Sequence, residues 1–302
     1  VGGLGVRSAS GTCGGECSGS SAVIRNCEVG GCYHSGDGAG IWCVNSGALI
    51  TNNVVHSNVC SKTGAGIGGY GSVTPEICYN EIYENESPHG SAIGFISPVS
   101  GLNIHHNVVR HNTTSSTGMA PVYINGTYSD IINNTIVFNT SGVSILSGSY
   151  CVIENNIIVS NDYFGINPAA AYVAYNDVWG NASYNNPGVN GISADPLFID
   201  PFGNNFQLMA ASPCINAGDP DPVYNDPDGT RNDMGAFPTV VVLPVAQDVS
   251  VSSEDQTHVV NHMPQFQWTF YDLEGYSQAA YEIQVGTDND WTVAEMWSSG
   301  EV

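Results

Sequence analysis

The feature that most constrains the fold is a nine-residue motif that recurs seven times between residues 24 and 181. Each copy begins with an aliphatic residue, and most copies carry asparagine at the fourth and ninth positions. The copies are IRNCEVGGC, ITNNVVHSN, ICYNEIYEN, IHHNVVRHN, IINNTIVFN, IENNIIVSN and VAYNDVWGN, beginning at Ile24, Ile50, Ile77, Ile104, Ile131, Ile153 and Val173. Their starts are 26, 27, 27, 27, 22 and 20 residues apart, a length that suits one coil of about three short strands in a solenoid.

Stacking such coils at the strand spacing of ~4.8 Å places equivalent residues directly over one another. Side-chain amides in register then form hydrogen bonds along the stack, and we expect two asparagine ladders. The fourth-position column is Cys27, Asn53, Asn80, Asn107, Asn134, Asn156 and Asn176, and the ninth-position column is Cys32, Asn58, Asn85, Asn112, Asn139, Asn161 and Asn181.

A second repeated segment supports the same register. GAGIW, GAGIG and GSAIG recur 26 residues apart, around Ile41, Ile67 and Ile93, and their glycines permit tight corners. A helical period of 3.6 residues is not found. The predicted fold class is therefore all-β, with a right-handed parallel β-helix (solenoid) over residues 1–238.

The motifs resemble those of right-handed β-helix repeat proteins with the pectate-lyase-like fold, as found in secreted and surface proteins of bacteria. The segment Ala194–Phe237 (ADPLFID to NDMGAF) resembles the C-terminal cap of such domains. The resemblance implies the fold and secretion. It implies no single activity, because this fold carries lyases, hydrolases, adhesins and inert stalks.

A second module is expected after the β-helix. Residues 239–247 are interpreted as a linker, and residues 248–302 resemble a partial Ig-like or fibronectin type III-like β-sandwich, with Trp268 and Tyr281 as core aromatics. Such sandwiches need about 100 residues. We therefore expect either that more chain follows or that another chain completes the sheet.

The composition indicates which classes of partner are disfavoured and which compartment is expected. Five Lys and Arg against 28 Asp and Glu give a formal charge of −23, which disfavours nucleic acid and anionic membranes. No apolar run approaches the ~20 residues of a membrane span. Nine cysteines favour an oxidising compartment, so an extracellular or cell-surface location is expected.

Two groups of candidate site residues come from motif positions next to the ladder asparagines, namely the second, third, seventh and eighth. If the register holds, Glu84, Arg110 and His111 lie on neighbouring coils and are the candidate catalytic residues of an enzyme. Aromatic and imidazole rings that could contact glycans form the candidate ligand-binding set: His56, Tyr79, Tyr83, His105 and His106. The alternative is an ordinary solvated face of the β-helix.

Five carboxylates crowd one Pro- and Gly-rich loop, and oxygen-rich loops of this kind can bind Ca²⁺. They are Asp219, Asp221, Asp226, Asp228 and Asp233. The alternative is that they accept hydrogen bonds from backbone N–H groups in turns, with Arg231 paired to one of them.

The sequence therefore predicts an extracellular structural or surface protein (an adhesin, stalk or filament subunit) that self-assembles or contacts glycans. The alternative is a polysaccharide-active enzyme, a glycoside hydrolase or a polysaccharide lyase. Lyases of the resembling fold use Lys or Arg bases, often with Ca²⁺, and the scarcity of Lys and Arg weakens that alternative.

Overall fold

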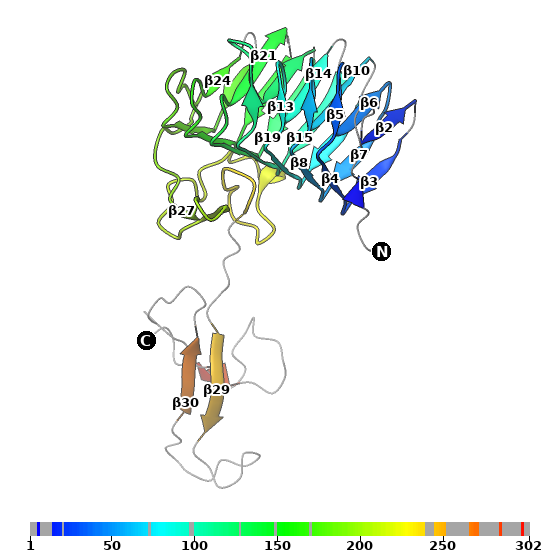
Figure 1. Cartoon of the computed structure of the whole chain (residues 1–302). Helices are drawn as coiled ribbons and strands as arrows, with labels where there is room; N and C mark the ends of the chain where they lie inside the picture. Colours follow the sequence, from blue (N-terminus) through cyan, green and yellow to red (C-terminus); the bar gives the residue numbers. More distant parts are fainter. Residues whose placement is uncertain are drawn as a thin grey trace. The chain divides into compact units, whose positions relative to one another are not determined.

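The structure is a computed structural model that describes residues 5–6, 14–19, 21–71, 74–96, 100–126, 128–147, 150–168, 171–238, 245–251, 266–271, 284–285 and 297–298. The chain divides into two compact units, Val1–Val240 and Val241–Val302. Figure 1 shows the first unit as a stack of parallel strands. The predicted all-β class and the parallel β-helix are confirmed.

Each coil of 26–27 residues passes in turn through sheets C, A, D and B, and equivalent strands of successive coils pair in parallel. Sheet C contains β3 (Val23–Arg25), β7 (Leu49–Thr51), β11 (Glu76–Cys78), β15 (Ser100–His105), β19 (Tyr128–Ile132), β22 (Tyr150–Glu154) and β25 (Tyr172–Ala174). Sheet A contains β1 (Gly5–Val6), β4 (Glu28–Gly30), β8 (Val54–His56), β12 (Glu81–Tyr83), β16 (Val108–Arg110), β20 (Thr135–Val137), β23 (Ile157–Val159) and β26 (Asp177–Trp179).

The other two sheets close the coil. Sheet B contains β2 (Gly15–Ser18), β6 (Ile41–Val44), β10 (Ile67–Tyr70), β14 (Ile93–Ile96), β18 (Val122–Asn125), β21 (Val143–Ser147) and β24 (Ile166–Asn167). The short sheet D contains β5 (Tyr33–His34), β9 (Val59–Cys60), β13 (Glu86–Ser87) and β17 (Thr113–Thr114). The sequence predicted about three strands per coil, and the fourth strand, in sheet D, was not predicted. It occurs where the coils are 26–27 residues long and is missing from the described coils of 22 and 20 residues, which lack the length for it.

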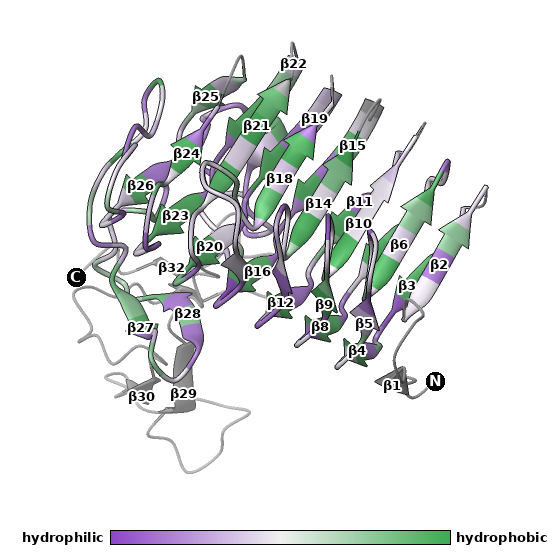
Figure 2. Ribbon diagram, turned by 45° about the horizontal axis from the view of Figure 1, so that its top comes forward, coloured by the Kyte–Doolittle hydropathy of each residue, from purple (hydrophilic) through white to green (hydrophobic). Residues whose placement is uncertain are grey.

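The interior is filled by columns of mostly aliphatic side chains that the strands of sheets A, B and C direct inward. Figure 2 shows the resulting alternation of hydrophobic and hydrophilic residues along the strands. Fully buried members include Ile50, Ile77, Ile104, Ile131, Val55, Ile82, Ile136, Ile67 and Ile93. Each such side chain contributes about 1.5–3 kcal/mol by leaving water.

Both asparagine ladders are present, and their members are buried. Asn107 represents the pattern: its Oδ1 accepts hydrogen bonds from the backbone N–H and from Nδ2 of Asn80, each at 3.0 Å. Its own Nδ2 donates to Oδ1 of Asn134 and to the carbonyl of Ile77. The ninth-position ladder ends where Asn181 donates to Asn185. Each such amide satisfies backbone groups of the preceding coil and donates to the amide oxygen of the next coil.

The residue before each ladder position, which holds asparagine or, in the first copy of the motif, cysteine, has a left-handed backbone with φ between +50° and +68°. At the third position of the motif these residues are Asn26, Asn52, Tyr79, His106, Asn133, Asn155 and Tyr175, and at the eighth they are Gly31, Ser57, Glu84, His111, Phe138, Ser160 and Gly180. Most L-residues adopt this conformation only at an energetic cost. The ladder hydrogen bonds hold the turn, so large side chains such as Tyr79 and His106 project from the corners between sheets.

The segment expected to cap the β-helix folds back over the outer face of sheet A. Residues 183–192 form isolated parallel bridges with the last coil. The chain then forms a hairpin of β27 (Phe198–Asp200) and β28 (Asn205–Leu208) and a short 3₁₀ helix, η1 (Pro222–Tyr224). Phe198, Phe206, Leu208 and Met234 pack against Val108, Val137, Ile157 and Val159 of sheet A.

In the second unit the structure describes four strands. β29 (Val245–Val251) pairs antiparallel with β30 (Phe266–Tyr271), which contains Trp268, and β31 (Gln284–Val285) pairs antiparallel with β32 (Trp297–Ser298). β29 begins inside the range 239–247 expected to be a linker. Tyr281 lies outside the described residues, and the sandwich stays a prediction. In the described part of the chain, no helix has the length and apolar character needed to cross a bilayer.

The ladder generates a stability prediction. Asn107→Ala should lower the free energy of unfolding by at least about 3 kcal/mol, because it leaves two buried donors of Asn80 without an acceptor. Urea-induced unfolding measures the loss. The matched control is Asn52→Gly, at an exposed left-handed position, where glycine is tolerated and about 1 kcal/mol or less is expected. Equal losses in the two variants would contradict a structural role for the ladder.

Candidate functional site

The candidate residues of sheet A form a stack on its outer face. Register pairs His56 with Tyr83 and Tyr83 with Arg110. The His56 ring is parallel to the Tyr83 ring at 5.0 Å, and the Arg110 guanidinium carbon lies 4.0 Å from the centroid of the same tyrosine ring. Nε and an Nη of Arg110 donate to one oxygen of Glu81, at 3.1 and 2.7 Å. Arg110 is therefore buried and already engaged by protein groups.

Glu84 and His111 lie beside this stack, at the exposed corner that follows sheet A. Glu84 accepts a hydrogen bond from Ser57 at 3.3 Å, and His111 stacks on Phe138 at 5.5 Å. The structure thus places the three candidate catalytic residues on neighbouring coils. Arg110 nevertheless faces Tyr83 and Glu81, and its guanidinium is occupied in holding the sheet surface together.

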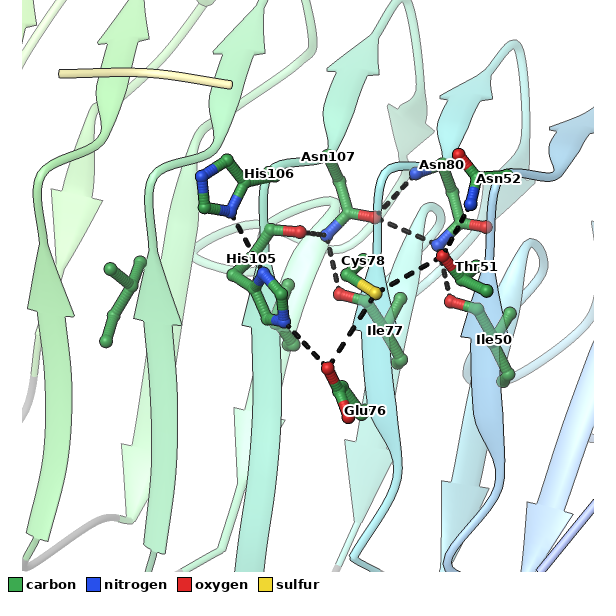
Figure 3. Close-up of polar contacts among 12 residues, drawn as sticks. Ile50, Thr51, Asn52, Glu76, Ile77, Cys78, Asn80, His105, His106 and Asn107 are labelled. Carbon is green, nitrogen blue, oxygen red and sulfur yellow. Dashed lines mark hydrogen bonds and ion pairs between the residues drawn. The ribbon is translucent and has the colours of Figure 1, made fainter. Parts of the chain in front are cut away.

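The ligand-binding candidates separate into two groups. His56 and Tyr83 belong to the stack on sheet A, whereas Tyr79, His105 and His106 lie at the end of β11 and β15 in sheet C. Figure 3 shows the two histidines. Tyr79 stacks on His106 at 5.0 Å and meets His105 edge-on at 5.8 Å. Nδ1 of His105 and Nδ1 of His106 are 2.9 Å apart, so one ring donates to the other.

These three rings form one wall of a pocket, which we call the sheet C pocket. Its volume is about 370 Å³. Sheet C and its corners contribute Tyr79, Asn103, His105, His106, Ile132 and Asn133, and the C-terminal segment contributes Val223, Tyr224, Asn225, Asp226, Pro227, Asn232 and Pro238. This lining, all of it from described residues, contains no Lys or Arg.

Two titratable groups of the pocket have shifted pKa values. Burial, with a contribution from the charge of His105, lowers the pKa of His106 to about 4. Burial and the neighbouring Asp233 raise the pKa of Asp226 to about 7. At neutral pH the His106 ring is therefore uncharged, and Asp226 is present in both its protonated and its ionised form.

A carboxyl pair lies further along the outer face of sheet C. Glu154 of β22 is buried, and Asp219 of the C-terminal segment reaches it. Burial, followed by the hydrogen bond and the charge of Asp219, raises the pKa of Glu154 to about 7, while a hydrogen bond with Tyr224 opposes the shift. Tyr224 thus contacts the carboxyl pair and also lines the sheet C pocket.

The aspartates proposed for Ca²⁺ accept hydrogen bonds from groups of the same C-terminal segment, mostly backbone N–H groups. Asp219 accepts from the N–H of Asp221 at 2.8 Å, and Asp221 accepts from the N–H of Val223 at 3.1 Å. Asp228 accepts from Thr230, Asp226 from the N–H of Asp233, and Asp233 from the N–H of Asn216. Arg231 donates to the carbonyls of Gly218 and Ala217. Calcium binding by this loop stays a prediction.

Several residues of these sites were not among the sequence candidates. Glu76 and Cys78 lie beside His105 on sheet C, and the ligand atoms of the three residues are within 4.8 Å of one another (Figure 3). Cys78 occupies the second position of the motif, directly before Tyr79, so its column could have pointed to it. Glu154 and Tyr224 meet through the fold of the C-terminal segment, for which the repeat holds no signal.

Comparison of the chain with protein-family models, with curated proteins and with solved structures gave no match. The geometry of this chain is therefore the basis for the functional proposals below.

The ion pair of Arg110 generates the first prediction from the site. Arg110→Lys should lower the free energy of unfolding by about 1–3 kcal/mol, because lysine cannot place two donors on Glu81 while lying flat on Tyr83. Chemical denaturation measures this change. An unchanged stability would mean that Arg110 is not structural and would return it to the candidate catalytic residues.

The carboxyl pair generates a prediction about pH. The raised pKa of Glu154 means that the folded state binds more protons than the unfolded state between about pH 4.5 and 7, so this group destabilises the fold as pH rises through that range. Glu154→Gln should remove this effect. The free energy of unfolding of the variant, relative to that of the unaltered protein, should therefore rise by up to about 3 kcal/mol from pH 4 to pH 8. Thermal or urea unfolding across this range measures the difference, and parallel pH profiles of the two proteins would refute the assignment.

Proposed function

We propose that the chain is an extracellular surface protein of adhesin type, whose β-helix binds neutral glycans in the sheet C pocket. The observation that carries the proposal is the composition of this pocket. Aromatic and imidazole rings from Tyr79, His105, His106 and Tyr224 surround a space of about 370 Å³, beside amide groups and one carboxyl. Rings that stack on sugar faces, with polar groups that accept hydroxyl protons, suit a carbohydrate.

The charge of the protein favours a neutral glycan over an acidic one. The lining contains Asp226 and no Lys or Arg, and the whole chain has a formal charge of −23. A polyuronate or sulfated glycan would be repelled by this field and would find no cationic partner in the pocket. Hexose hydroxyl groups can donate to Asp226 and to the side-chain oxygens of Asn103 and Asn225.

The β-helix supports binding by holding the rings in place before a ligand arrives. Tyr79 precedes the ladder residue Asn80, and His106 precedes the ladder residue Asn107. The backbone at each ring is therefore held by buried hydrogen bonds to two neighbouring coils. A site of this kind loses little conformational entropy on binding.

An alternative function is glycan hydrolysis. The observation that favours it is Asp226, because a general acid works best with a pKa near the ambient pH, and that of Asp226 is about 7. Glycosidases use a second carboxyl roughly 5–9.5 Å from the first, and Asp226 is the one carboxyl among the described lining residues. Release of products from any neutral glycan, abolished by Asp226→Asn, would establish the enzyme.

The binding proposal is tested by calorimetry with neutral oligosaccharides (gluco-, xylo-, manno- and chito-oligosaccharides) and with polyuronates as the acidic comparison. Tyr79→Asn should weaken binding of the neutral ligand about tenfold or more, because a stacking ring is lost. Asparagine already occupies this left-handed position in other coils, for example at Asn52 and Asn133, so the fold is retained.

The control is Tyr150→Ser, which removes a tyrosine that is 64% exposed and lies outside the pocket. This variant should bind as the unaltered protein does. Binding of polyuronates in preference to neutral sugars, or equal losses in the two variants, would contradict the proposal.

A further inference from the structure

The outer face of sheet C brings together three side chains of the types that bind transition metals. Glu76 and Cys78 lie two residues apart on β11, and Cys78 is the register partner of His105 on β15. Oε1 of Glu76 is 3.1 Å from Nε2 of His105 and 3.9 Å from Sγ of Cys78. All three ligand atoms lie within 4.8 Å of one another, and Figure 3 shows them converging on one side of the sheet.

Two of the three separations are close to those expected around a small tetrahedral ion. Bonds of ~2.0–2.3 Å from zinc to oxygen, nitrogen and sulfur place neighbouring ligands of a tetrahedron roughly 3.3–3.8 Å apart. The two separations from Glu76 lie just outside this range on either side. Small rotations of exposed Glu76 would bring its oxygen into position, while Cys78 and His105 are held by the strand register.

Groups around the cluster orient two of the ligands. Nδ1 of His105 lies 2.9 Å from Nδ1 of His106. In the tautomer in which His105 is the donor, its proton is on Nδ1 and the lone pair of Nε2 is free to bind a metal. Metal-ligating histidines usually make such a second hydrogen bond. Sγ of Cys78 donates to Oγ1 of Thr51 at 3.4 Å, and Asn52 donates to the same oxygen at 2.9 Å. Once the thiol has lost its proton, the Thr51 hydroxyl can donate to the sulfur instead. That hydrogen bond stabilises a thiolate.

From this geometry we propose that Glu76, Cys78 and His105 bind one Zn²⁺ ion, with the fourth coordination position open. One thiolate, one imidazole and one carboxylate form a donor set that zinc accepts, and the two anionic ligands balance its charge. Calcium and magnesium prefer oxygen ligands and do not fit this set. His105 also lines the sheet C pocket, so the ion would lie beside its wall, but the inference does not depend on glycan binding.

Cobalt is the probe for this site, because a thiolate bound to Co²⁺ produces a charge-transfer band in the near ultraviolet. The full chain, freed of metal with a chelator and reduced with a phosphine, is titrated with Co²⁺ without oxygen. We expect one equivalent to bind with this band and with the strong visible absorption of four-coordinate cobalt. One equivalent of Zn²⁺ should displace it. The lack of a charge-transfer band in the unaltered protein would overturn the proposal.

Three variants test whether Cys78 is the thiolate ligand. Cys78→Ser should abolish the band and weaken zinc binding at least about 100-fold, whereas Thr51→Val should keep the band and weaken binding about tenfold, as expected for a group that contacts a ligand. Cys27→Ser, which removes a half-buried thiol of the first motif, is the matched control and should change neither. Circular dichroism confirms that each variant folds. A band that persists in Cys78→Ser would overturn the assignment.

Discussion

The side-chain amide hydrogen bond between successive coils is the interaction on which the rest of this structure depends. Each ladder asparagine, such as Asn80 or Asn107, satisfies backbone groups that the turn leaves without partners, and does so in a buried position where an unpaired group is costly. The same bonds fix the register of one coil on the next. A shift by one residue would break them together with the aliphatic columns of the interior.

This constraint also determines what the surface presents. The turn that the amide stabilises requires a left-handed residue directly before it, and that residue projects from a corner between sheets. Asparagine occupies the position in several coils, whereas Tyr79 and His106 occupy it in two neighbouring ones. Tyr79 and His106 in the wall of the sheet C pocket thus occupy a motif position where several other coils carry asparagine. The stack of His56, Tyr83 and Arg110 on sheet A arises from the same register, but its members are engaged with one another.

Much of the fold was predictable because the repeat is written directly in the sequence. The spacing of the motif predicts the coils, and the asparagine columns predict the ladders and the neighbours of Tyr83 and His105. The site was only partly predictable. Tyr224 and Asp226 reach the pocket because the segment after Asp195 folds back and packs Phe198 and Met234 on sheet A. This packing joins residues about 100 positions apart, as in the hydrogen bond between Asn133 and Asn232, and no local pattern encodes it.

If the sheet C pocket binds glycans as proposed, residues from three segments distant in the sequence contact one ligand. Hydrogen–deuterium exchange of the full chain, with and without a neutral oligosaccharide in excess, tests it most directly, since it locates the ligand without altering the protein. Binding in the pocket should slow exchange in peptides that contain residues 76–79, 103–106 and 223–232, and leave exchange around residues 54–57 and 81–84 unchanged. Protection confined to the sheet A stack, or no protection with any neutral glycan, would contradict it.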